Sequence, residues 1–171
     1  MNQSFFIHEA GKAEVPVLAR LIRDAFRDVA VRFALTPENC PKHPSNCTDA
    51  WIETDLARGV RYFMLSHAGE PVGCAGLERP NPSVCYLTRL SVLPARRRRG
   101  FGRALAEHVL TLARNGGAEK AGIGIIADQT DLARWYSGLG FVDTGTKRFE
   151  HLPFVVRFME CPLSSNKEPI A

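Results

Sequence analysis

The sequence lacks the two features that would place the protein in a membrane or outside the cell. No hydrophobic run approaches the roughly 20 residues that a membrane-spanning helix needs. The first residues, MNQSFFIHEAGK, do not combine a basic stretch with an apolar one, so they do not resemble a secretion signal. We therefore expect a cytoplasmic protein that does not contact a membrane.

A cysteine pattern suited to disulfides is also missing. The chain has five cysteines, an odd number, and three of them lie in apolar, strand-like runs. This pattern predicts buried thiols in a reducing compartment rather than a disulfide framework.

Charge of one sign does not dominate the chain. Its 171 residues carry a formal net charge of +4, and 45% of them are hydrophobic, which is ordinary for a soluble globular protein. The length suits one domain, placed at residues 1–163, followed by a polar tail (164–171) that we expect to be disordered.

The positive charge is concentrated in RRRR (96–99). No second basic or aromatic-rich stretch accompanies it, so no nucleic-acid partner is expected.

Apolar periodicity and turn residues predict alternating strands and helices. The predicted strands are 5–9, 60–66, 72–78, 84–92, 121–127, 146–150 and 154–161. The predicted helices are 14–26, 49–57, 101–115 and 130–139. Because a helix joins 84–92 to 121–127, these two strands should be parallel neighbours, or near neighbours, in one sheet.

One segment has the composition of a phosphate site. In LTRLSVLPARRRRGFGRALAEHVL (87–110), a predicted strand leads through a basic loop into a helix. A helix start offers unpaired N–H groups and the positive end of the dipole, which suit a phosphate. Gly100 and Gly102 allow close backbone approach, and Arg97–Arg99 and Arg103 supply forked donors. We predict a cradle for a pyrophosphate.

Two common phosphate motifs do not match this segment. A Walker loop requires GxxxxGK[ST], which is absent from the sequence. A dinucleotide fingerprint requires GxGxxG after the first strand. Here Gly100-Phe-Gly102 lacks the third glycine and follows a later strand.

Three motifs instead resemble those of the GNAT superfamily of acyl-CoA N-acyltransferases. RRRGFG (97–102) fits [QR]-x-x-G-x-[GA], LSVLP (90–94) resembles L-x-V-x-P at the end of the family's fourth strand, and YSGLGF (136–141) resembles Y-x-x-x-G-F at its last helix. The order of predicted elements also matches, from residue 5 to 161. The resemblance implies an α/β (α+β) fold. Its mixed, mostly antiparallel central sheet has about seven strands, helices on both faces, and a splay between the fourth and fifth strands.

The resemblance further implies acetyl-CoA as cosubstrate and an amine, on a small molecule or a peptide, as acceptor. Backbone groups of Leu90 and Val92 would pair with the pantetheine arm, and N–H groups of 97–103 would hold the pyrophosphate. Tyr136 would donate a proton to the departing thiolate, since a phenol with a pKa of about 10 is protonated at neutral pH. Gln129 replaces an asparagine that the family often has seven residues before the tyrosine. The predicted cofactor-binding residues are Leu90, Ser91, Val92, Arg97, Arg98, Arg99, Gly100, Phe101, Gly102, Arg103 and Gln129.

The sequence gives weaker evidence for the residue that deprotonates the amine than for the cofactor site. Family members often place a glutamate on the fourth strand, but CYLTRLSV (85–92) contains no acid. Glu78, near the end of the preceding strand, is the nearest candidate, so the predicted catalytic residues are Tyr136 and Glu78. The missing acid leaves a second hypothesis open, a catalytically weak acyl-CoA-binding sensor or interaction module on the same fold.

A long loop, RFALTPENCPKHPSNC (32–47), is the candidate acceptor lid, because family members build their acceptor pocket there and because loops of this length tend to be functional. Cys40, His43 and Cys47 form C-x2-H-x3-C, but no fourth zinc ligand is evident, and we expect no metal. The sequence does not identify the acceptor. Nearby acids could attract a cationic amine, although acids on helix faces are usually just solvated; these are Glu38, Asp49, Glu53 and Asp55. A monomer and a homodimer both remain open.

Overall fold

The computed structural model describes residues 4–164, which form one seven-stranded sheet with four α-helices. The strands are β1 (Phe5–Glu9), β2 (Arg61–His67), β3 (Glu70–Glu78), β4 (Val84–Val92), β5 (Lys120–Ile126), β6 (Val142–Arg148) and β7 (Val155–Pro162). The helices are α1 (Val15–Arg32), α2 (Asp49–Ala57), α3 (Phe101–Asn115) and α4 (Thr130–Ser137). Nearly all of the predicted tail, residues 165–171, lies outside the described residues.

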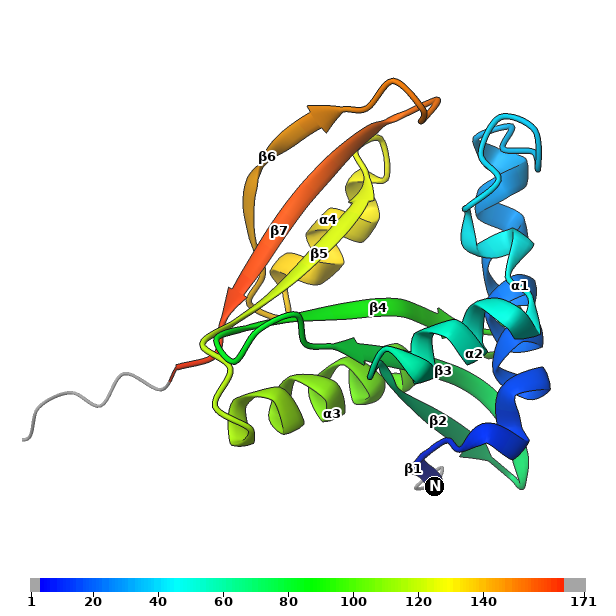
Figure 1. Ribbon diagram of the computed structural model, residues 1–171, viewed down its shortest axis with the longest axis vertical. Helices are drawn as coiled ribbons and strands as arrows, with labels where there is room; N and C mark the ends of the chain where they lie inside the picture. Colours follow the sequence, from blue (N-terminus) through cyan, green and yellow to red (C-terminus); the bar gives the residue numbers. More distant parts are fainter. Residues whose placement is uncertain (1–3, 165–171) are drawn as a thin grey trace, which may run out of the picture.

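The sheet divides between β4 and β5. The strand order is β1-β2-β3-β4-β5-β7-β6, and every neighbouring pair is antiparallel except β4 with β5. These two strands pair only from Val84–Tyr86 to Lys120–Gly122 and then diverge (Figure 1). This arrangement confirms the predicted mixed, mostly antiparallel fold.

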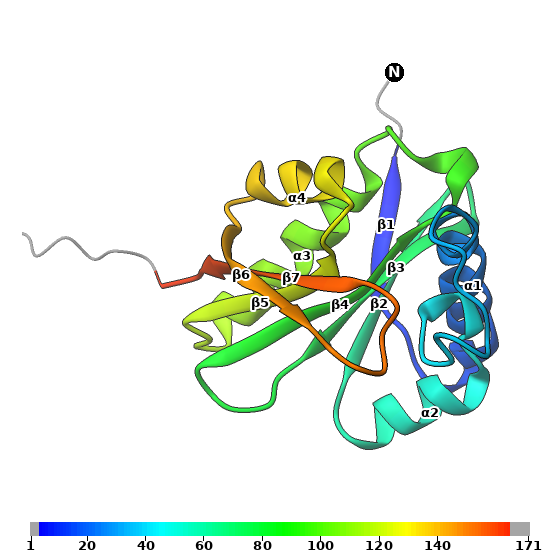
Figure 2. The same ribbon diagram turned by 90° about the horizontal axis from the view of Figure 1, so that it is seen from above.

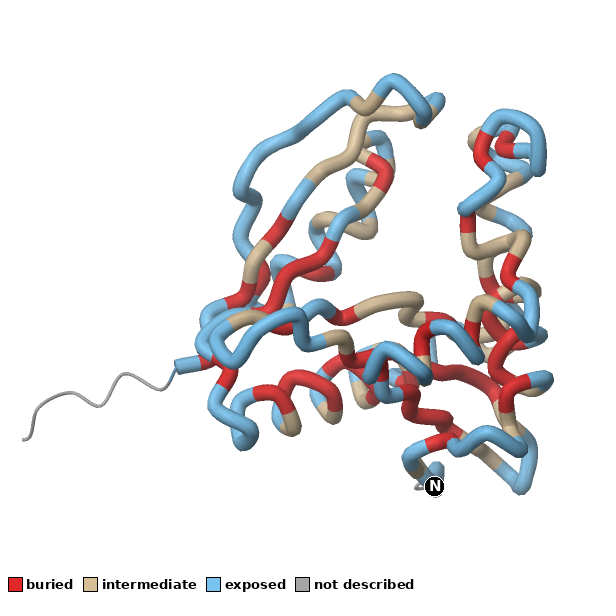
Figure 3. Tube along the Cα trace, in the orientation of Figure 1, coloured by how far each residue is buried: buried red, intermediate tan, exposed pale blue. Residues whose placement is uncertain are grey.

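Helices cover both faces of the sheet, and each face has its own core. On β2, Phe63 and Leu65 pack in the cluster that contains α3, whereas Tyr62 and Met64 pack in the cluster that contains α1 and α2. This division follows from the alternation of side chains along a strand. Figure 2 shows α1 and α2 apart from α3 and α4. Burial is densest around β2–β4, whereas β6 is exposed along its length (Figure 3).

Local sequence signals account for several boundaries. Helix α2 begins as predicted because the Thr48 side chain accepts a hydrogen bond from the Trp51 N–H (3.4 Å). Helix α3 ends at Asn115, where Gly116 and then Gly117, with φ of +87°, follow it.

Two predicted elements differ from the structure by four residues or more at one end. Helix α1 continues to Arg32 instead of ending at residue 26, because Val29 and Ala30 pack against Leu35 of the following loop. Strand β6 covers Val142–Arg148 rather than 146–150, because it pairs along most of β7 and accommodates a bulge near Gly145. Within the described residues, no helix is long and apolar enough to cross a membrane. All five cysteines are buried and unpaired.

Candidate functional site

The divergence of β4 and β5 opens a cleft of about 1040 Å³. Residues of α1, β4, β5 and α4 line it, together with the loop before α3 and the loop after α1. The predicted site residues that line this cleft are Leu90, Ser91, Val92, Arg97, Arg98, Gln129 and Tyr136. The structure therefore gathers residues from all three recognised motifs around one space.

The end of β4 presents an unpaired backbone edge to the cleft. The Leu93 N–H donates to the Val72 carbonyl of β3 (2.9 Å). Because backbone groups alternate along a strand, Val92 and Leu90 direct their N–H and C=O groups to the side that β5 has left. The Val92 carbonyl indeed accepts a bond from the Arg97 Nε (3.2 Å) instead of from a strand. Such an edge can pair with an extended amide-containing chain.

The loop before α3 holds a series of free N–H groups. Within residues 4–164, the backbone N–H groups of 98–103 donate to no backbone or side-chain acceptor. Arg98 and Gly100 have positive φ angles, 62° and 82°, which turn the chain into the helix. No protein atom lies within 4 Å of the position that a Cβ on Gly100 would take. Consecutive free N–H groups at a helix start form an anion-binding concavity.

The arginines around this loop divide into paired and free side chains. Arg97 binds Asp28 of α1 (2.5 Å) and the Ala25 carbonyl (2.7 Å), and it thereby lowers the pKa of the Asp28 carboxyl. Arg103 pairs with Glu107 (3.1 Å). The prediction treated Arg97 and Arg103 as phosphate donors, whereas the structure shows their side chains joined to acids of the chain.

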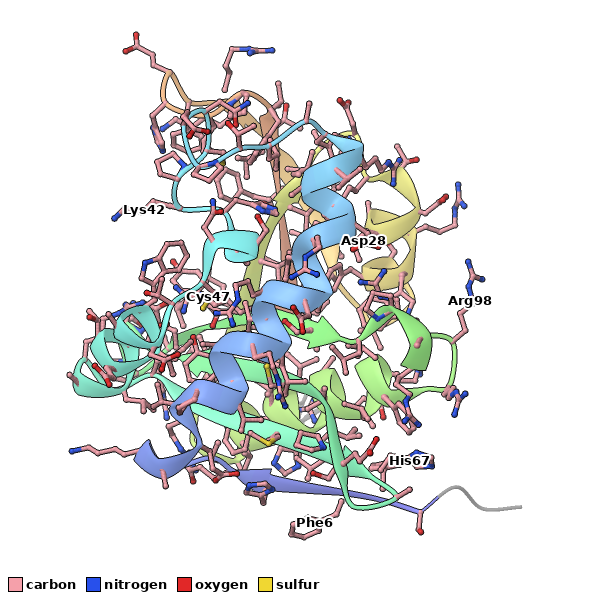
Figure 4. All side chains as sticks on the ribbon, turned by 90° about the vertical axis from the view of Figure 1, so that its right-hand side faces the viewer. Phe6, Asp28, Lys42, Cys47, His67 and Arg98 are labelled. Carbon is pink, nitrogen blue, oxygen red and sulfur yellow. The ribbon has the colours of Figure 1, made fainter. Side chains whose placement is uncertain are left out.

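Arg98 and Arg99 remain available to a ligand. Both are exposed, and neither forms an ion pair with a described residue. Figure 4 shows Arg98 extending away from the body of the protein, while Asp28 lies on α1. Phe101 differs from its neighbours because its side chain packs in the core, so only its N–H can serve a ligand.

Tyr136 lies in the wall of the cleft and is 6% exposed. Its ring contacts Trp135 and Phe141 edge-on, with centroids 4.9 and 5.3 Å away. Its hydroxyl forms no hydrogen bond with a described residue. Burial raises the pKa of Tyr136, so the phenol keeps its proton at neutral pH. Gln129, half-buried at the start of α4, lines the same cleft.

The point where β4 and β5 stop pairing and diverge is called the fork here. Glu78 lies in a different cavity, of about 640 Å³, on the other side of this fork. Its carboxylate forms an ion pair with Arg58. Leu87 and Arg89 line both cavities, but Glu78 does not line the cleft that contains Tyr136. The structure thus does not bring the two predicted catalytic residues into one space.

The loop after α1 reaches across the open end of the fork. Leu35 and Cys40 pack with Ile126 of β5 and with Phe154 next to β7. Lys42 extends away from this loop (Figure 4). The loop therefore spans from α1 to the far half of the sheet, where a lid would have to lie.

His43 is the part of this loop that lines the cleft. It is 6% exposed, packs edge-on to Phe26 (5.8 Å), and its Nδ1 accepts the Ser45 N–H (3.3 Å). Burial lowers the pKa of His43, which favours a neutral ring. Cys40 and Cys47 pack in separate clusters, and no group of three metal-binding side chains converges within residues 4–164.

Comparison with known proteins identifies the family. The model of the acetyltransferase (GNAT) family matches residues 21–141. The chain belongs to the GNAT family. An uncharacterised N-acetyltransferase of Mycobacterium tuberculosis is 29% identical over 137 residues, which cover 74% of this chain and 86% of the relative.

Solved structures share the fold of this GNAT protein. The ribosomal-protein-S18-alanine N-acetyltransferase of Escherichia coli has a TM-score of 0.77 and 17% identity, over 98% of this chain and 99% of the other. A putative acetyltransferase of Salmonella typhimurium, solved with acetyl-CoA, has a TM-score of 0.70 and 20% identity, over 98% of each chain. The PaiA N-acetyltransferase of Thermoplasma acidophilum, solved with coenzyme A, has a TM-score of 0.77 and 12% identity, over 93% and 99%.

A buried ionic network beneath the fork of this GNAT protein escaped the sequence prediction. Asp55 of α2 is 5% exposed and accepts a hydrogen bond from the Tyr62 hydroxyl of β2 (2.5 Å). Arg89 of β4 pairs with Asp55 through Nη1, which also donates to the Tyr62 oxygen (2.7 Å). Arg58 binds the other Asp55 oxygen (3.0 Å). The one feature of the sequence that could have indicated this network is Arg89, a charged residue within the otherwise uncharged fourth strand.

Proposed function

We propose that this GNAT protein transfers an acetyl group from acetyl-CoA to a primary amine by direct attack of the amine on the thioester. The observation that carries this proposal is the presence, around one cleft, of three separate elements. These are the open edge of β4, the free N–H groups of 98–103 and the protonated phenol of Tyr136. Each element matches a different part of one elongated acyl-CoA molecule.

The residues present fit such a ligand. The free N–H groups, with Arg98 and Arg99, suit the pyrophosphate, and the Leu90 and Val92 backbone suits the amides of the pantetheine arm. The unused Tyr136 hydroxyl can donate to a thiolate as it forms. The ligands named for the Salmonella and Thermoplasma proteins, acetyl-CoA and coenzyme A, support this assignment.

Glu78 remains our proposal for the general base. Since it lies in the adjoining cavity and is paired with Arg58, it would have to act at a distance, through water that connects the two cavities. Glu78→Gln should then remove a limb of the pH–rate profile for kcat/KM without changing acetyl-CoA affinity. An unaltered profile would exclude Glu78 as the base.

The absence of a free carboxylate among the described residues of the cleft favours a second candidate function. Because no carboxylate lies on the open part of β4 and Glu78 is held by Arg58, the protein could bind acetyl-CoA without turning it over, as a sensor. Calorimetry with acetyl-CoA, followed by a thiol-release assay across amines, amino acids, polyamines and peptide N-termini, separates the two functions. Binding without thiol release above the hydrolytic background would favour the sensor. Absence of binding would contradict both.

The setting of this activity belongs to the same proposal. We propose a cytoplasmic enzyme formed by a single domain over residues 1–163, with a small molecule or peptide as acceptor and no nucleic-acid partner. The acetylation screen addresses the acceptor directly, and sedimentation of the purified chain decides between a monomer and a homodimer.

A further inference from the structure

We propose that the acceptor amine carries a carboxylate and that Arg89 binds it; this inference rests on the proposed acetyl transfer. The acceptor would be an amino acid or a similar amino carboxylate rather than a polyamine. Four observations carry the inference: the free edge of the Arg89 guanidinium, its fixed orientation, its place in the fork and the pairing of every acid around it.

Arg89 uses only part of its hydrogen-bonding capacity. Its Nη1 contacts Asp55 and the Tyr62 hydroxyl, but Nε and Nη2 donate to no described residue. These two nitrogens form the edge of a guanidinium that receives a carboxylate through two parallel bonds. Arg61 shows this geometry in the same chain, since its Nε and Nη2 bind the two oxygens of Glu9 at 2.8 and 2.9 Å.

The free edge is held in place. Asp55 fixes one side of the guanidinium, and the Trp51 ring lies 5.7 Å from its central carbon, within the range of a cation–π contact. Arg89 also adopts a φ of 48°, in the left-handed region that non-glycine residues rarely occupy. A strained residue that its surroundings hold in place is typical of a functional position.

Arg89 lies at the junction of the two cavities. It lines both the cleft that contains Tyr136 and the smaller cavity beyond the fork, and its side chain is 23% exposed. It belongs to β4, next to Leu90, whose backbone faces the divergence of the strands.

The surrounding acids are unsuited to a polycationic acceptor because each already has a basic partner. In the larger cleft Asp28 pairs with Arg97 and Asp131 with Arg134. In the smaller cavity Glu78 pairs with Arg58, and Glu160 with Lys120 (2.9 Å). The acids that the sequence suggested for attracting a cation, Glu38, Asp49 and Glu53, line neither cavity, and Asp55 is buried in its network.

The test compares amines with and without the carboxylate. Alanine, methionine and phenylalanine are assayed against their C-terminal amides, with spermidine as a polycation. Because amidation lowers the pKa of the α-amino group, kcat/KM is measured at saturating acetyl-CoA over a pH series and expressed per unprotonated amine. The wild-type protein should prefer the acid over the amide by about 10- to 100-fold, the range of a charge-assisted hydrogen bond. Equal rates for acid and amide, or a preference for spermidine, would overturn the inference and leave the proposed acetyl transfer intact.

Substitutions test whether Arg89 causes the preference for the acid over the amide. Arg89→Gln alone leaves Asp55 without one of its partners and could disturb folding. The double variant Arg89→Gln/Asp55→Asn keeps the network neutral and should lose the preference for the acid. Arg61→Gln is the control, since it removes an arginine with the same two-nitrogen geometry that lines neither cavity, and it should retain the preference. Retention of the preference in a folded double variant would exclude Arg89.

Binding calorimetry tests the Arg89 site even if the protein acetylates no amine. If acetyl-CoA binds but no amine is acetylated, acetyl transfer fails as the proposed function. Calorimetry of methionine and its amide with the CoA-bound protein then tests Arg89 by itself. Tighter binding of the acid would support the site, and equal binding would refute it.

Discussion

Gly100 offers the sharpest test of the N–H cradle. It precedes α3 with a φ of +82°, and a Cβ at this position would meet no protein atom within 4 Å. Gly100→Ala therefore introduces no clash with the chain, but it costs about 1–2 kcal/mol because L-residues are disfavoured in left-handed backbone. A domain with a typical unfolding free energy of about 5–15 kcal/mol stays folded after such a loss.

The loss of CoA affinity should exceed what this strain alone produces. The new methyl group projects into open space next to the free N–H groups, and backbone relaxation would redirect these N–H groups. Losing one or two charge-assisted hydrogen bonds costs about 2–3 kcal/mol, which corresponds to a roughly 30- to 150-fold weaker Kd. Pantetheine, which has no pyrophosphate, should bind the variant almost as well as it binds the wild type.

Gly69 provides a matched control. It lies in the turn between β2 and β3 with a φ of +79°, and it also has open space around its Cβ position. Gly69→Ala should show the same loss of stability in urea unfolding but unchanged CoA affinity by calorimetry. If the two variants bind CoA equally well, the N–H groups of 98–103 do not hold the pyrophosphate.

Three further predictions concern the walls of the cleft. Tyr136→Phe should lower kcat on the order of 10²-fold with unchanged CoA affinity, because its hydroxyl acts only as the thiolate leaves; an unchanged kcat without a pre-steady-state burst would show that the ring only packs. Shortening the 32–47 loop, or replacing Glu38 and His43 with alanine, should raise KM for the amine and leave CoA binding nearly intact, whereas an unchanged KM would make the loop a connector. The lowered pKa of His43 means that the folded state favours the neutral ring, so its contribution to stability is complete above about pH 6.5 and declines as the pH falls toward the folded pKa. His43→Asn, which can still accept the Ser45 N–H, should therefore reduce the stability lost between pH 7.5 and 5. Burial also lowers the pKa of His108, so His108→Gln should reduce the loss as well, and the double variant should reduce it further; an identical pH dependence in His43→Asn and the wild type would contradict this assignment.

The parts of the fold that could be predicted from sequence depend on local interactions. Strand β4 and helices α2 and α3 match their predicted bounds because turn residues, a threonine cap and paired glycines specify their ends within a few residues. Helix α1 and strand β6 differ because their ends depend on distant partners. The last turn of α1 packs in the cluster that contains Ile126 of β5, and β7 sets the extent of β6. No local signal encodes these contacts.

The same distinction applies to the site. Backbone geometry that glycines specify, such as the turn at Gly100, was evident in the motif. The environment of Asp55 was not, because an acid on a short helix resembles a solvated residue until Tyr62 and Arg89 are brought to it from other strands. Only its position in the sequence, near an acid-free strand, pointed to Glu78. Its actual neighbours are Arg58 and the smaller cavity.

The arginine run shows most clearly why residue type alone cannot assign a role. Four consecutive arginines look equivalent in the sequence, yet Arg96 binds Glu70 and Arg97 binds Asp28, which are 26 and 69 positions away. Arg97 also reaches the carbonyls of Ala25 and Val92, so it joins α1, the end of β4 and the loop into one unit. This unit ties the start of the loop to the body of the protein. The positive charge of the run thus acts partly through structure: Arg96 and Arg97 bind acids elsewhere in the chain, and we propose that Arg98 and Arg99, which form no ion pair with a described residue, neutralise the pyrophosphate.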